Sequence, residues 1–296
     1  MTAGPSDLGV VDRARETELL EAALASGANV VLEGPPGTGK STLLRRVAAR
    51  REARFALVEG NAELTPARLV GHFDPALVLD RGYRPDVFVD GPLVSAMREG
   101  GLLYVEELNR VPEETLNALL TVMSEREITV PRLGVVRAAD GFGVVAAMNP
   151  YDAVGTARVS SAVYDRTCRI AMGYQSAEAE LQIISQRAPV QSVEWVQRVV
   201  ELVRATRAHP ELRVGSSVRG AMDLVGLARE LARSRGVDGE DWQVGLDAAL
   251  VALSGRIRVD ESSTRTPEAI IEELYAQAFG PRPDGPGGED ESSGEA

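Results

Sequence analysis

The first half of the chain alternates short apolar runs with amphipathic stretches. Leucine, valine and alanine recur at helical spacing in four segments, which the pattern predicts as helices: residues 12–26, 41–50, 92–99 and 113–124. Between them lie compact apolar runs that are typical of buried strands: residues 30–32, 55–58, 102–105, 144–148 and 169–172. This alternation of strand and helix predicts an α/β domain with a mostly parallel sheet.

Two stretches depart from that alternation. Residues 128–136 carry Pro131 and Gly134 between apolar positions, which predicts a hairpin inserted before the strand at 144–148. Residues 69–89 contain two glycines and two prolines, which favour a loop or an irregular insertion.

Beyond about residue 174 the apolar positions follow helical spacing alone. Five amphipathic stretches predict an all-α domain: residues 177–187, 194–208, 217–234, 240–253 and 267–279. The final segment, PRPDGPGGEDESSGEA, is acidic and of low complexity, so we expect it to be disordered. The sequence therefore predicts an α/β core over residues 1–174, a helical domain over 175–280 and an acidic tail over 281–296.

Composition narrows the classes of function. The 296 residues are 44% hydrophobic, which is ample for one or two cores, and the single cysteine, Cys168, excludes an internal disulfide and a multi-cysteine metal site. The net charge is −12, of which the tail, with one arginine and five acids, contributes −4. The remaining acidic balance disfavours nucleic acid as the main partner. No apolar run approaches the roughly 20 residues that span a bilayer, so we expect a cytoplasmic protein without a membrane partner.

The strongest chemical signal is the segment GPPGTGKS, from Gly34 to Ser41. It fits the phosphate-binding pattern G-x-x-x-x-G-K-[ST] in full and lies between a predicted strand and a predicted helix. Its glycines let backbone N–H groups close round phosphates, Lys40 can reach the β- and γ-phosphates of ATP, and the Ser41 hydroxyl can ligate Mg²⁺. The alternative is an ordinary glycine-rich turn. The predicted nucleotide-binding residues are Gly34, Pro35, Pro36, Gly37, Thr38, Gly39, Lys40, Ser41 and Thr42.

The use of basic residues supports this interpretation. Of the 32 basic residues 31 are arginine, and the one lysine, Lys40, stands at the lysine position of the motif. A compact ammonium between phosphates is not interchangeable with a guanidinium.

A second signal is the run LLYVEE over residues 102–107, an apolar strand that ends in two acids. Such a strand end suits a position beside a bound nucleotide. One carboxylate can hold the Mg²⁺ shell while the next polarises the attacking water. A strand that runs out into solvated charges is the alternative, and the P-loop upstream disfavours it. We predict Glu106 and Ser41 as metal-binding residues and Glu107 as catalytic.

Taken together, these segments resemble the MoxR branch of the AAA+ ATPases. The motifs GPPGTGKS, VEELNRVPEETLNALLTVMSEREITV, VVAAMNP, VYDRTCRI and GSSVRG occur in the family's order, over roughly residues 30–253. The resemblance implies a five-stranded P-loop core with a helical lid, assembled as a hexameric ring. It also implies chaperone-like remodelling or maturation of a client enzyme, often a metalloenzyme, beside a partner that carries a von Willebrand factor A domain.

The resemblance assigns four roles. Glu107 resembles the Walker B glutamate that orients water, and Asn149 resembles sensor 1, which helps to place that water. Arg166 resembles the arginine finger given to the neighbouring subunit's ATP. Arg219 resembles sensor 2, which reaches from the lid to the phosphates.

Two residues depart from the family's pattern. Glu106 stands where the family usually has aspartate, one methylene shorter, and Thr167 follows the finger where the family usually has phenylalanine. Arg158 and Arg169 remain alternative candidates for the arginine finger.

Two further classes of function stay open. One is a DNA-directed AAA+ motor, which the acidic balance and the lack of an appended basic module disfavour. The other is an ATP-binding switch that does not hydrolyse, which would have no evident need for Glu107, Asn149 and both arginines.

Lys40 is the only side-chain amine, so acetylation of amines should modify two places, Lys40 and the N-terminus. We expect saturating ATP·Mg to protect Lys40, because bound phosphates engage its amine, and we expect its modification to abolish nucleotide binding. Peptide mass spectrometry measures the labelling of Lys40, with the N-terminus as the unprotected control, and a nucleotide-binding assay on the acetylated protein measures the loss of binding. Equal labelling of Lys40 with and without ATP·Mg would remove it from the phosphate site.

Overall fold

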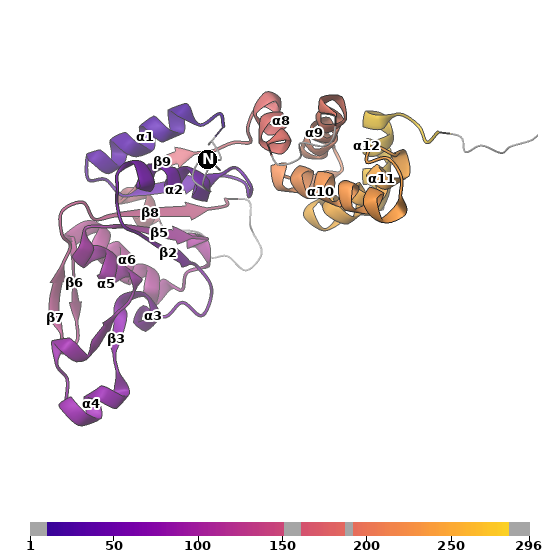
Figure 1. Ribbon diagram of the computed structural model, residues 1–296. Coiled ribbons are helices and arrows are strands. Elements are labelled where there is room, and N and C mark those ends of the chain that lie inside the picture. Colours follow the sequence, from indigo (N-terminus) through magenta and orange to yellow (C-terminus); the bar gives the residue numbers. More distant parts are fainter. Residues whose placement is uncertain (1–10, 151–160, 187–191, 284–296) are drawn as a thin grey trace, which may run out of the picture. The chain divides into compact units, whose positions relative to one another are not determined.

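The computed structural model describes residues 11–150, 161–186 and 192–283 of the 296-residue chain. They fall into two compact units, divided between Tyr174 and Gln175. Figure 1 labels the elements in chain order. Within the described ranges no helix has the length and apolar character needed to cross a membrane.

The first unit is built on a five-stranded sheet in the order β2–β5–β8–β1–β9. Every neighbouring pair in it is parallel. This confirms the predicted α/β class. The strands are β1 (Val30–Glu33), β2 (Phe55–Glu59), β5 (Leu102–Glu106), β8 (Gly143–Met148) and β9 (Cys168–Ala171).

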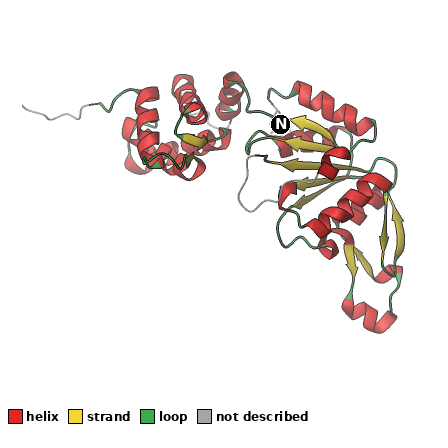
Figure 2. Ribbon diagram, turned by 180° about the vertical axis from the view of Figure 1, so that it is seen from behind, coloured by secondary structure: helices red, strands yellow, loops and turns green. Residues whose placement is uncertain are grey.

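Helices cover both faces of this sheet (Figures 1 and 2). Side chains of β1 alternate between two buried clusters: Val30 and Leu32 pack with the α1 and α2 face, and Val31 packs with the α5 and α6 face. A strand buried on both sides gains from apolar residues at every position, which explains the continuous runs in the sequence. The helices of this unit are α1 (Ala14–Ala25), α2 (Lys40–Arg50), α3 (Pro66–Val70), α5 (Pro92–Glu99), α6 (Glu113–Glu125) and α7 (Ser161–Asp165).

Residues 69–89 form an ordered hairpin with a helix at its tip, where the sequence pattern indicated only a loop or irregular insertion. Asp74 caps that helix by accepting from the amides of Ala76 and Leu77. Phe73 packs edge-on against both Tyr83 and Phe88, with ring centroids 5.1 Å apart in each pair. The segment comprises β3 (Gly71–Phe73), α4 (Pro75–Arg81), a 3₁₀ turn (Pro85–Val87) and β4 (Phe88–Asp90), with β3 and β4 antiparallel.

The hairpin predicted over residues 128–136 is present as antiparallel β6 (Glu127–Val130) and β7 (Gly134–Arg137). Arg132 in its turn has a left-handed backbone, with φ of 66°. Its guanidinium lies 3.7 Å from the centroid of the Tyr83 ring. A cation–π contact therefore links the two inserted hairpins.

The second unit is helical, as predicted, but it is not all-α. Two short strands, β10 (Leu212–Val214) and β11 (Arg258–Val259), pair antiparallel. Runs of two or three residues are too short to show alternation, so the sequence pattern missed them. The predicted tail lies outside the described residues from position 284 onward. The helices are α8 (Ala177–Ser185), α9 (Val193–Ala208), α10 (Val218–Arg235), α11 (Trp242–Leu253) and α12 (Pro267–Phe279).

One buried acid ties α8 to α9. Glu180 is 1% exposed, and its carboxylate lies 3.2 Å from Nη1 of Arg204 and 2.7 Å from Nη1 of Arg207. Arg207 Nε also donates to the carbonyl of Ser216, 2.6 Å away, in the turn before α10. The start of α10 is thus held by a buried charge network.

We expect Glu180→Ala to lower the free energy of unfolding of the second unit by about 3 kcal/mol or more, because it removes the buried carboxylate that pairs with both Arg204 and Arg207. Chemical unfolding followed by circular dichroism measures the change. The matched control is Glu230→Ala, since Glu230 is 48% exposed and pairs with Arg229 and Arg233 on the surface. That control should shift stability by less than about 1 kcal/mol. Equal effects of the two substitutions would refute a structural role for the network.

Candidate nucleotide-binding site

Three neighbouring strands bring the predicted site residues to one edge of the sheet. β8 lies between β5 and β1, and all three are parallel, so their carboxyl ends share that edge. Gly34 follows β1, Asn149 follows β8 and Glu107 follows β5. The amide of Gly34 donates to the carbonyl of Met148, 3.2 Å away. Ligands of open α/β sheets bind at such an edge.

The loop from Gly34 to Ser41 depends on its glycines. Gly37 and Gly39 have φ of 77° and 85°, in the left-handed region that favours glycine. A Cβ on Gly34 would stand 2.0 Å from the carbonyl oxygen of Met172, which no side chain could tolerate. The helix α2 begins at Lys40, directly after Gly39. The loop therefore ends at the N-terminus of a helix, where free backbone amides favour the binding of anions.

Lys40 lies along the loop that precedes it. Its Nζ donates to the carbonyls of Gly34 and Pro35, at 2.7 Å and 2.8 Å. Thr38, which is buried, donates from its hydroxyl to the Pro35 carbonyl at 3.0 Å. The ammonium of Lys40 is thus placed within the loop whose amides would hold phosphates.

Ser41 and Glu106 lie in contact, as a shared metal site requires. The Ser41 hydroxyl donates to Oε1 of Glu106, and the Tyr104 hydroxyl lies 3.2 Å from Ser41 Oγ. Hydroxyl and carboxylate oxygens are the ligands that Mg²⁺ prefers. The longer glutamate in place of aspartate therefore still reaches Ser41. Burial raises the pKa of Tyr104, and the Glu106 carboxylate raises it further.

Glu107 has a strained backbone. Its φ of 50° lies in the left-handed region, where a residue other than glycine is uncommon and costs energy. Gly60 packs beside it: the Gly60 amide donates to the Glu106 carbonyl at 2.8 Å, and a Cβ there would stand 2.4 Å from the Glu107 carbonyl oxygen. The Glu107 side chain is 44% exposed and lies 3.0 Å from Nη1 of Arg110. The carboxylate that follows β5 is thus partly exposed and paired with Arg110.

Arg166 lies at the opposite edge of the sheet from the P-loop of its own chain. It precedes β9, whose first residue, Cys168, is the register partner of Val30 at the start of β1. β1 has four residues, so about 13 Å of strand separates the two edges. Arg166 Nε donates to Ser124 Oγ at 2.6 Å, and Nη1 donates to the Ala162 carbonyl at 3.0 Å. The fold does not bring Arg166 to Lys40 within one chain.

The alternative candidates for the arginine finger differ from Arg166. Arg169, in β9, forms an ion pair with Glu33, the last residue of β1, which is 10% exposed. The Tyr164 hydroxyl lies 3.5 Å from the same carboxylate. Arg169 is thus engaged with a buried acid of its own chain. Arg158 lies outside the described residues.

Arg219 belongs to the second unit. It lies in the first turn of α10, where its side chain is exposed. The hydroxyl of Ser217 caps this helix by accepting from the Arg219 amide at 3.4 Å. Thr206 Oγ1 accepts from the amide of Ser216 at 2.9 Å and so fixes the preceding turn.

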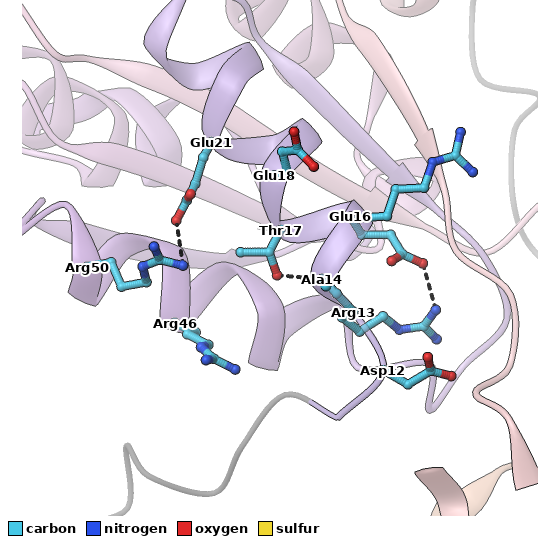
Figure 3. Close-up of a pocket in the computed structure, with 10 residues that line it drawn as sticks. Asp12, Arg13, Ala14, Glu16, Thr17, Glu18, Glu21, Arg46 and Arg50 are labelled. Atoms are coloured by element: carbon cyan, nitrogen blue, oxygen red, sulfur yellow. Dashed lines mark hydrogen bonds and ion pairs between the residues drawn. The ribbon is translucent and has the colours of Figure 1, made fainter. Parts of the chain in front are cut away.

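Sequence reasoning missed one residue that supports the P-loop, Arg13. Its side chain is 5% exposed, and its guanidinium donates to the carbonyls of Thr38, at 3.1 Å, and of Gly173. A pocket of about 590 Å³ beside it is lined by residues of α1 and α2 and by the residues just before α1 (Figure 3). An ion pair to Glu16 at 2.8 Å lies in that pocket. Nothing in the local pattern distinguishes Arg13 from the other arginines of the chain.

Known proteins resemble this chain in sequence. The family model described as AAA domain (dynein-related subfamily) matches residues 29–167. An uncharacterized protein of Staphylococcus epidermidis is 31% identical over 215 residues, which cover 71% of this chain and 81% of that protein.

Two solved structures resemble the fold. A candidate ATPase from Cytophaga hutchinsonii shares 22% identity, with a TM-score of 0.51 over 91% of this chain and 90% of that one. A point mutant of RuvB from Thermotoga maritima shares 17% identity, with a TM-score of 0.56 over 84% of this chain and 73% of that one. At these identities the likeness concerns the fold alone.

Proposed function

This chain belongs to the AAA family, with a domain of the dynein-related subfamily over residues 29–167, and on that premise we propose that it binds ATP with Mg²⁺ and hydrolyses it. The observation that carries the proposal is the convergence of Lys40, Ser41, Glu106 and Glu107 at the carboxyl edge of the sheet. Glu106 ends β5 and Glu107 follows it, while Lys40 and Ser41 begin α2.

Each residue has a role that its position supports. The amides of the loop and the Lys40 ammonium bind the phosphates, and Ser41 and Glu106 hold Mg²⁺, directly or through water. Mg²⁺ neutralises charge on the β- and γ-phosphates when it is bound. Glu107 accepts a hydrogen bond from the attacking water and orients it, and Asn149 helps to place that water.

We further propose that the active unit is a ring of identical subunits, a hexamer as in the MoxR branch. The position of Arg166 at the sheet edge away from its own P-loop supports a role in the site of a neighbour. A guanidinium that reaches the γ-phosphate from the next subunit stabilises the charge of the transition state. The resemblance gives Arg219 the role of sensor 2, which stays a prediction.

The work done by this ATPase is proposed to be chaperone-like remodelling of MoxR type in the cytoplasm. The support is the motif order and the elements over which the run VEELNRVPEETLNALLTVMSEREITV extends: the end of β5, the helix α6 and β6, the first strand of the following hairpin. The proposed partners are a protein with a von Willebrand factor A domain and a client enzyme. A pull-down with a Glu107→Gln variant, which should hold ATP and its client, would identify them.

A DNA motor is the second candidate, because a related Thermotoga maritima RuvB structure is described as a Holliday junction branch migration motor. The net charge of −12 disfavours it. ATPase rates with and without duplex DNA decide between the two: a rate unchanged by DNA favours the remodelling role, and strong stimulation favours the motor.

Glu107→Gln should retain ATP binding and lower turnover by roughly 10²-fold or more, since the amide cannot accept the water's proton. Glu106→Gln should instead raise the Mg²⁺ concentration needed for activity. Glu114→Gln, the same change at an exposed position of α6, is the control and should keep the wild-type rate. Phosphate release measures all three. Wild-type turnover by Glu107→Gln would move the catalytic role elsewhere, to Glu106 first.

Mixed rings test the shared site. Lys40→Ala and Arg166→Ala should each be inactive alone, because a finger in trans can contribute roughly 10³–10⁵ in rate in P-loop NTPases. In co-assembled rings some interfaces pair the intact Lys40 of one variant with the intact Arg166 of the other. We expect partial recovery of ATPase in such rings.

The control mixture is Lys40→Ala with Glu107→Gln. Both residues lie in the same site of the same subunit, so no interface in that mixture is complete and no recovery is expected. If mixed rings form and both mixtures stay equally inactive, Arg166 does not act in trans. The mixing would then be repeated with Arg158→Ala and Arg169→Ala.

A further inference from the structure

Tyr104 is a buried tyrosine beneath the P-loop with a polar end that core packing alone does not explain. It lies in β5 with no exposed surface, and its ring packs near that of Phe55, with centroids 5.9 Å apart. A phenylalanine would fill that space as well. The hydroxyl of a buried tyrosine needs a partner, and here it lies 3.2 Å from Ser41 Oγ, within hydrogen-bond distance.

The direction of this hydrogen bond follows from the number of hydrogens. The Ser41 hydroxyl has a single hydrogen, which it donates to the carboxylate of Glu106. With that hydrogen directed at Glu106, Ser41 Oγ is left to accept from Tyr104, whose hydroxyl also interacts with the Glu106 carboxylate. The result is a directed chain from Tyr104 through Ser41 to Glu106, in which one lone pair of Oγ accepts from the tyrosine and the other remains available.

We propose that Tyr104 is a positioning residue for Mg²⁺, acting through Ser41: it orients the Ser41 hydroxyl so that one lone pair of Oγ is left for the metal while the hydrogen of that hydroxyl stays directed at the Glu106 carboxylate. This inference rests on the proposed ATP·Mg function of the same site. In this proposal, a core tyrosine helps to preorganise a metal site in which the carboxylate comes from Glu106, a longer residue than the usual aspartate. Tyr104 touches neither nucleotide nor metal in this role.

The test is Tyr104→Phe, with the dissociation constant of ATP measured by calorimetry both in Mg²⁺ and in EDTA. We expect binding in Mg²⁺ to weaken about fivefold, the effect of losing one hydrogen bond of about 1 kcal/mol, and binding in EDTA to stay unchanged. Mn²⁺ bound with ATP, observed by electron paramagnetic resonance, should weaken by the same factor. A purely structural role would shift both constants together or neither, and either result would overturn the proposal.

Tyr275→Phe is the matched control. Tyr275 is the other tyrosine without exposed surface in the described part of the chain, and its hydroxyl donates to the carbonyl of Trp242 at 3.1 Å in the second unit. Its loss should lower the thermal midpoint without changing the ratio of the two ATP constants.

A double-mutant cycle tests the route through Ser41. In a Ser41→Ala background Tyr104→Phe should cause no further loss of Mg²⁺-dependent binding, since the residue through which it acts is absent. An additive loss would overturn the route. If the wild-type chain bound ATP with no dependence on Mg²⁺, the proposed function itself would fail. If the wild type shows that dependence and Tyr104→Phe retains it in full, only the role of Tyr104 fails.

Discussion

The parallel register of β5, β8 and β1 is the constraint on which the site depends. Backbone hydrogen bonds between these strands bring their carboxyl ends level, and the bonds from Gly34 to Met148 and from Gly60 to Glu106 continue this alignment into the loops. The residues at this edge that are assigned to phosphates, metal and water therefore stand in or directly after buried strands, or at the start of α2. Rigid elements hold a reacting geometry more accurately than long loops do.

Four charged groups at this edge have partners inside the protein. Lys40 donates to two carbonyls, Glu106 accepts from Ser41, Glu107 pairs with Arg110, and the buried Glu33 pairs with Arg169. A nucleotide would therefore exchange partners rather than meet bare charges. An unpaired charge at a partly buried position is costly. The internal partners therefore stabilise the loop before phosphates bind. The affinity for the nucleotide then depends on how much more strongly Lys40 binds a charged phosphate oxygen than a neutral backbone carbonyl.

Sequence pattern was sufficient where one physical effect dominated. The buried strands showed themselves as continuous apolar runs because both faces of the sheet are covered, and the P-loop showed itself because few residue types fit its backbone. Prediction from the sequence pattern failed where elements were too short to show periodicity, as in β10 and β11. It also failed where capping and turn residues, rather than hydrophobic periodicity, determine the structure, as in the hairpin around Asp74. The roles of Arg13 and Tyr104 depend on contacts between segments distant in sequence, which no local pattern carries.

Arg13 also bears on where this domain begins. The family match starts at residue 29, and every motif residue of the core lies within 29–167. Yet the carbonyl of Thr38 in the P-loop accepts a hydrogen bond from Arg13, which lies sixteen positions before the match begins at residue 29. The same side chain binds the carbonyl of Gly173, six positions past the match's end at 167. A chain cut to the matched span would keep the motif residues of the core but lose the side chain that binds both Thr38 and Gly173. The segment that stabilises the P-loop therefore extends beyond the matched span on both sides.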